Sequence, residues 1–217
     1  MTNDEYSAVV LSSVQELKEL RNQAVSLAKG VIGETLLSED LYFCASLDRC
    51  IRLIDGFIPM LQSRNLTCAG VLLRMQMDNC MRTYAAFIVK DKDLLFRSLL
   101  DGSRIDKLKD KDGHKFSDGY LKGQVDKIAP GFEKVYDQVC GFVHLSSKAF
   151  YQTVGECKDG KFGFLIGLPL PEKRNEPLLE CAHAYIHYVK LFFKLIQAVV
   201  DSKQRYDSQG DSHESGS

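Results

Sequence analysis

Arginine and aspartate residues that could handle a phosphate or a carboxylate group recur within one apolar segment of the chain. Arg74, Asp78 and Arg82 are spaced four apart, so they share one face of a helix. A guanidinium suits either anion because its donors form a planar fork. Asp78 lies one turn from each arginine, so the alternative is a self-contained ion-pair network that fixes the helix register. The spacing favours this structural interpretation.

A second set of reactive side chains lies in the segment YDQVCGFVHLSSKAF, residues 136–150. Tyr136, Cys140 and His144 recur at spacings of four and follow one seam of a helix, and Ser146 and Ser147 come directly after it. The imidazole could act as a general acid or base, and a Cys–His pair could form a thiolate nucleophile, but no third group orients the histidine. A histidine at a helix C-terminus more often caps the last carbonyls, and we expect that role for His144.

These two segments supply all the candidate site residues. A catalytic site would use Arg74, Arg82 and His144, and a binding site would add Asp78, Tyr136, Ser146 and Ser147. Glu180, His183 and His187 have the spacing of metal ligands, but they lie on the polar face of an amphipathic helix with its acids early and its lysines late. We therefore expect no metal site and no cofactor.

The elements that must position these residues are helices. Apolar periodicity predicts an all-α bundle of five to seven helices with one small β-hairpin near residues 149–167, where an Asp-Gly turn follows Cys157. A lone hairpin is marginal in water, so we expect it to pack on helices. The helix around residues 67–89 is apolar nearly all round, which predicts a central place. The expected helices span residues 3–29, 38–59, 67–89, 91–100, 117–128, 131–144 and 176–201, with Pro59 ending or kinking the second.

Composition and local sequence predict the domain boundaries and the cellular compartment. We predict one helical domain over residues 1–201, a disordered polar tail over 202–217, and a mobile surface connector or lid over 104–119. The seven cysteines form no C-x-x-C pair, which favours a reducing cytoplasm. The N-terminus has no signal-peptide pattern, and no uncharged apolar stretch is long enough for a membrane span. The formal net charge of -1 gives no basic field, so we expect no DNA partner.

Three segments carry a family resemblance. LLRMQMDNCMRTYAAF, FSDGYL and YDQVCGFVHLSSKAF resemble uncharacterised bacterial helical proteins of the AbiV-like and related domain-of-unknown-function kind, and more distantly the HEPN superfamily. The resemblance covers roughly residues 40–150. It implies a bundle of four or five helices that often dimerises, and in many HEPN proteins a metal-independent RNase of a toxin–antitoxin or phage-defence system.

The chain departs from this pattern at its most diagnostic position. The HEPN nuclease signature places an arginine shortly before the catalytic histidine on one helix, whereas Asp137, Gln138 and Val139 precede His144 and this helix has no arginine. Only Arg74 or Arg82, from another helix, could complete such a site. We therefore predict a protein-interaction or defence-associated helical module, which binds a protein partner or forms a homodimer. The alternative is an RNase or nucleotide-handling enzyme with an Arg/His site. Burial of Arg74 and His144 distinguishes the two.

Overall fold

The computed structural model describes residues 3–144, 154–158, 161–167 and 175–214 of the 217-residue chain and shows an all-α helical bundle, as predicted. A short 3₁₀ helix, η1, and one strand pair accompany the helices. The elements are α1 (Asn3–Ile32), α2 (Ser38–Gln62), α3 (Leu66–Ile88), α4 (Lys92–Leu100), η1 (Ile105–Lys107), α5 (Asp118–Ile128), α6 (Phe132–Val143), β1 (Val154–Lys158), β2 (Lys161–Phe164) and α8 (Asn175–Glu214).

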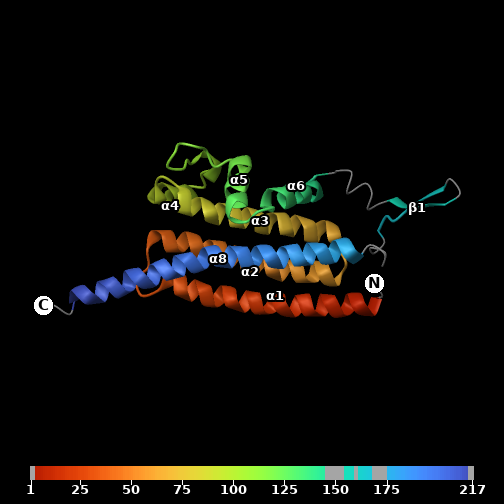
Figure 1. Ribbon diagram of the computed structural model, residues 1–217, viewed down its shortest axis with the longest axis horizontal. Helices are drawn as coiled ribbons and strands as arrows, with labels where there is room; N and C mark the ends of the chain where they lie inside the picture. Colours follow the sequence, from red (N-terminus) through yellow and green to blue (C-terminus); the bar gives the residue numbers. More distant parts are fainter. Residues whose placement is uncertain (1–2, 145–153, 159–160, 168–174, 215–217) are drawn as a thin grey trace.

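Four long helices form the body of the molecule. Figure 1 shows α1, α2, α3 and α8 running alongside one another, with α4, α5 and α6 on one side. The core between the long helices is filled by large side chains, and the rings of Phe57 and Tyr185 stack with centroids 3.8 Å apart. α3 contacts α2, α8, α5 and α6, which confirms the predicted central place of this helix.

The helix ends follow from local sequence. Asn65, Asp91 and Ser117 each accept a hydrogen bond from a backbone N–H of the first turn of α3, α4 or α5, so polar N-caps begin these helices. Pro59 does not end α2, which continues to Gln62. Its missing N–H removes only one hydrogen bond, and it does so within the last turn.

The last helix is longer than the sequence predicted. α8 continues through the polar residues after Asp201, where we expected a disordered tail from 202. Lys203 is buried there and its Nζ lies 2.6 Å from Asp40 Oδ2 at the start of α2, while Asp207 accepts a hydrogen bond from the backbone N–H of Glu34. The helix persists because these polar side chains find partners in the α1–α2 connection.

The predicted hairpin is confirmed, but its setting differs from the expectation. β1 and β2 pair antiparallel, with Val154 opposite Phe164 and Lys158 opposite Lys161. Figure 1 shows the strands standing away from the bundle rather than lying over a helix. In the described part of the chain, none of the helices combines the length and apolar character that crossing a bilayer requires.

The segment from Arg104 to Gly119 is a built connection rather than a loose loop. It contains η1, and short antiparallel bridges join Val89 to Asp110 and Lys109 to Lys115. Leu108 and Phe116 are buried under it. These two apolar anchors hold the segment against the bundle and place Ser117 and Asp118 at the start of α5, next to the arginines of α3.

Candidate functional site

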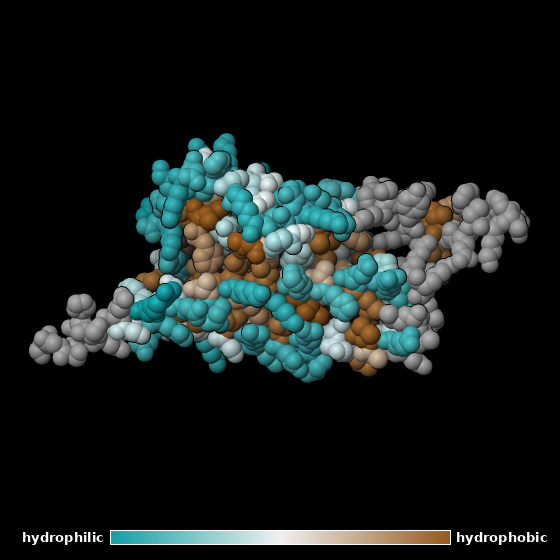
Figure 2. Space-filling model, in the orientation of Figure 1, coloured by the Kyte–Doolittle hydropathy of each residue, from teal (hydrophilic) through white to brown (hydrophobic). Residues whose placement is uncertain are grey.

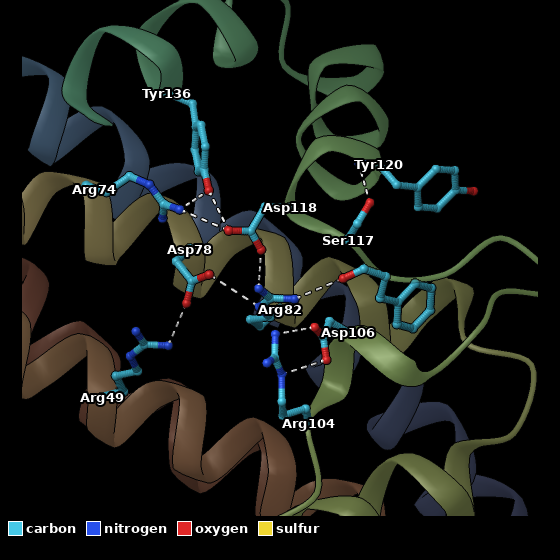
Figure 3. Close-up of polar contacts among 11 residues, drawn as sticks. Arg49, Arg74, Asp78, Arg82, Arg104, Asp106, Ser117, Asp118, Tyr120 and Tyr136 are labelled. Carbon is cyan, nitrogen blue, oxygen red and sulfur yellow. Dashed lines mark hydrogen bonds and ion pairs between the residues drawn. The ribbon is translucent and has the colours of Figure 1, made fainter. Parts of the chain in front are cut away.

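Arg74, Asp78 and Arg82 lie on one face of α3, and this face meets α5 and α6 (Figure 3). The predicted ladder within the helix forms only in part. Arg82 Nε lies 3.2 Å from Asp78 Oδ1, one turn away. Arg74 does not join this pair but reaches Asp118, the first residue of α5, at 3.2 Å from Nη2 to Oδ2. The three residues therefore link α3 to its neighbours instead of only to one another.

Asp118 is the centre of this cluster. One carboxylate oxygen accepts a hydrogen bond from Arg82 Nη2 and the other from Arg74 Nη2. Tyr136 of α6 donates its hydroxyl to Asp118 Oδ2 at 3.1 Å and itself accepts a hydrogen bond from Arg74. An aspartate in the first turn of a helix is favoured by the helix dipole, and Ser117 caps the same turn. The sequence segment SDG thus carried a signal for an acid at a helix start, but not for its partners.

Further contacts complete the arginine–aspartate cluster. The Arg74 guanidinium lies over the Tyr136 ring, 3.7 Å from its centroid, an arrangement that attracts a cation to the ring face. Arg82 Nη1 donates to the carbonyl oxygen of Phe116 at 3.2 Å. Arg49 of α2 reaches the second oxygen of Asp78 at 3.1 Å. Sequence reasoning missed Arg49, Phe116 and Asp118, because each comes from a separate element.

Burial shows how much of the cluster a ligand could reach. The side chains of Arg74, Asp78 and Arg82 are 15%, 18% and 19% exposed, whereas that of Asp118 is 48% exposed. All three nitrogens of Arg82 have partners. Arg74 Nε is buried and has no hydrogen-bond partner in the described structure. The most exposed member of the cluster is therefore the Asp118 carboxylate. Its negative charge would repel a phosphate group that approached the arginines.

His144 lies apart from the arginines. It is the C-cap residue of α6, where we expected it, and its side chain is exposed. α6 runs antiparallel to α3, because Gly70 faces Phe142 while Arg74 faces Tyr136. His144 is eight residues beyond Tyr136, about 12 Å along the helix, in the direction away from Arg82. The Arg/His site across the bundle is therefore not assembled, and Ser146 and Ser147 lie outside the described residues.

Two sets of metal-ligand types occur in the described chain. Glu180, His183 and His187 are all exposed, which confirms the predicted solvated face of α8. Ligand atoms of Asp110, Asp112 and His114 lie within 4.8 Å of one another, a grouping that sequence reasoning missed. It lies in a tight turn of the 104–119 segment.

The Asp110 carboxylate of this turn is already committed to protein donors. It accepts hydrogen bonds from the backbone N–H groups of Asp112 and His114 and from the Tyr120 hydroxyl. Burial by itself raises the pKa of Asp110, but the hydrogen bonds from Tyr120 and His114 outweigh it and lower the pKa to about 2. We assign Asp110 the role of closing the turn and holding α5.

No protein-family model, no curated protein and no solved structure matches this chain. The resemblance to AbiV-like and HEPN proteins stays a prediction, and the function has to be argued from the geometry.

Proposed function

We propose that the chain is a non-enzymatic helical module that binds a protein partner through its β-hairpin. The observation that carries this proposal is the exposure of two large apolar side chains two positions apart in the sequence, one at the end of the second strand and one just after it. Phe164 is 63% exposed and Ile166 is 77% exposed. Exposed large apolar side chains that lie near one another are a common feature of protein–protein contacts.

The setting of the hairpin supports the same interpretation. A two-stranded hairpin is marginally stable in water, and here it stands away from the bundle with no third strand in the described residues (Figure 1). The outer edges of β1 and β2 present backbone groups to which another strand could add. A partner that covers Phe164 and Ile166 would supply the burial that the hairpin lacks. A second copy of this chain is the partner that we test first.

The arginine–aspartate cluster argues against catalysis. Arg82 is fully paired and Arg74 is held by Asp118 and Tyr136. His144 is exposed at the end of α6, about two turns beyond the tyrosine that contacts Arg74. Buried arginines that are paired in this way hold helices together, and breaking one pair leaves a buried charge. The cluster therefore positions α5 and α6. The six cysteines whose side chains the structure describes are free thiols, which fits a reducing cytoplasm.

The first experiment measures self-association by sedimentation velocity over a range of concentrations. The wild type is expected to dimerise, and the double variant Phe164→Ser, Ile166→Ser is expected to dissociate at least tenfold more readily, because loss of two interface anchors costs roughly 2 kcal/mol or more. The matched control is Leu11→Ser on α1, which is 69% exposed and lies on the helical body. Equal association of the double variant and the wild type would overturn the hairpin interface.

The second candidate, a metal-independent RNase of a defence system, is favoured by one observation, the unpartnered Nε of Arg74, whose Nη2 binds the Tyr136 hydroxyl. Wild type, Arg74→Ala and His144→Ala are incubated with RNA in the presence of a chelator, and each melting temperature is recorded. The module predicts no cleavage, a lower melting temperature for Arg74→Ala and an unchanged one for His144→Ala. Cleavage by the wild type that Arg74→Ala abolishes would replace the module with the enzyme.

A further inference from the structure

Three lysines stand side by side on a small antiparallel layer beside α4. The backbone N–H of Lys90 donates to the carbonyl of Lys109 at 3.1 Å, next to the bridge between Val89 and Asp110, so Lys90 and Lys109 are directly opposite each other. Lys109 and Lys115 form the next bridge. Two backbone hydrogen bonds flank this bridge, from Phe116 to Leu108 and from Asp110 to His114. Lys109 and Lys115 therefore form a non-hydrogen-bonded pair, the kind in which the two side chains lie closer together.

The layer has a buried face and a charged face. Val89, Leu108, Asp110 and Phe116 are buried beneath it, while Lys90, Lys109 and Lys115 are exposed on its outer side. Like charges directly opposite each other across strands are destabilising. None of these three lysines forms an ion pair with a residue that the structure describes. Such a row is stabilised by an anion that lies across it.

A hollow of about 750 Å³ adjoins this lysine row and is lined from several elements. Its volume falls in the usual range for small-molecule sites. Its apolar part comes from Val89, Leu94 and Leu108, and its charged part from the lysines and acids Lys90, Lys92, Lys107, Lys109, Glu39, Asp91 and Asp93. Two of the three acids are engaged within the protein, because Glu39 pairs with Lys92 and Asp91 caps α4. Figure 2 shows hydrophilic surface over this end of the molecule.

We infer that the hollow binds a small organic polyphosphate, of which a nucleoside diphosphate is the simplest example. Adjacent phosphates lie across Lys90 and Lys109, which line the hollow, and extend toward Lys115, while the organic part rests on Leu94, which is 49% exposed. The N-terminus of α4, whose first residue Lys92 lines the hollow, adds its positive dipole end. A long nucleic acid fits less well because the row is short and the whole chain carries a net charge of -1.

The test is calorimetric titration of the full chain with ADP and, separately, with inorganic tripolyphosphate and a short single-stranded RNA. The wild type is expected to bind ADP with a dissociation constant that rises when the salt concentration is raised, as phosphate contacts to lysine require. Lys109→Gln with Lys115→Gln is expected to weaken ADP binding by about tenfold or more, the size of a lost charged contact. Lys18→Gln, an exposed lysine of α1, is the matched control and should bind as the wild type does.

A thermal scan of the ligand-free proteins separates binding from folding. Removal of two repelling lysines should leave the melting temperature unchanged or raise it, so weaker binding cannot come from unfolding. Equal ADP affinity in the double variant and the wild type, or no binding of either phosphate compound by the wild type, would overturn the site. RNA binding far tighter than ADP binding, and lost in the same variant, would overturn the small-molecule ligand in favour of a nucleic acid.

Discussion

Lys203→Met is the substitution whose outcome the structure predicts most sharply. The side chains of Lys203 and Asp40 are each 3% exposed, and their charged atoms lie 2.6 Å apart. Lys203 also donates to the carbonyl oxygen of Thr35, so its ammonium fastens the end of α8 to the α1–α2 connection. Methionine keeps most of the side-chain volume and removes the charge, which leaves the Asp40 carboxylate buried without its cation.

The magnitude follows from the burial of that carboxylate. Loss of one partner of a buried ion pair costs about 3–5 kcal/mol of unfolding free energy. Asp40 keeps the hydrogen bond from the Leu37 backbone N–H, so the lower part of this range applies. For a chain of this size, each kcal/mol moves the melting temperature by about 2–4 °C, which predicts a fall on the order of 10 °C.

Urea unfolding of wild type, Lys203→Met and Lys194→Met measures the effect. The midpoint of Lys203→Met should fall with an unchanged slope, whereas Lys194, an exposed lysine of the same helix, should change stability by no more than about 0.5 kcal/mol. Adding Asp40→Asn to Lys203→Met should restore part of the lost stability. Asparagine removes the unpaired charge and still offers an oxygen that can accept the hydrogen bond from the Leu37 backbone N–H. Equal stability of Lys203→Met and Lys194→Met would refute the packing of α8 beyond Asp201.

Two further substitutions test the seams around α3 and α5. Gly70→Ala places a methyl group 2.4 Å from the Phe142 ring, so overpacking should lower the unfolding free energy by about 1–3 kcal/mol, while Gly123→Ala in α5, which meets nothing within 4 Å, should raise it slightly in the same urea assay. The depressed pKa of Asp110, about 2 against an ordinary 3.8, contributes stability that is present above pH 3.8 and is lost as the pH falls toward 2. Asp110→Asn should therefore be less stable at neutral pH and lose less on acidification over that window, as urea midpoints across the range will show.

The helices were predictable because their signals are local. Apolar spacing placed α3, α5 and α6 within a residue or two of their observed bounds. The same reasoning failed after Asp201, where the polar sequence predicted a disordered tail although α8 continues. Lys203 is buried because Asp40, distant in the sequence, neutralises it. A polar residue stabilised by one distant partner leaves no periodic trace in the sequence.

The candidate site was predictable on one helix only. The spacing of Arg74, Asp78 and Arg82 correctly placed them on one face, but it suggested that Asp78 serves both arginines. The structure gives Arg74 to Asp118 instead, through a contact between residues 44 positions apart. The polar residues of α6 were predicted to lie along one seam, but the structure separates them. Tyr136 faces α3, while His144, on the same sequence line, lies past the end of the helix, where no contact with a described residue orients it toward the arginines.

The arrangement explains why charged groups sit in a seam that apolar residues could fill. α5 and α6 have 11 and 12 residues, lengths at which an isolated helix is marginal. Apolar packing against α3 alone would let short helices slide along it, because such contacts are not directional. The Asp118 carboxylate accepts hydrogen bonds from two arginines about two helical turns apart and from Tyr136, so one position of α5 and one register of α6 satisfy all three donors. Burial of Arg74 and Arg82 is unfavourable, but their hydrogen bonds fix the positions of α5 and α6 on α3. Residues that resemble a phosphate site therefore have a structural use here.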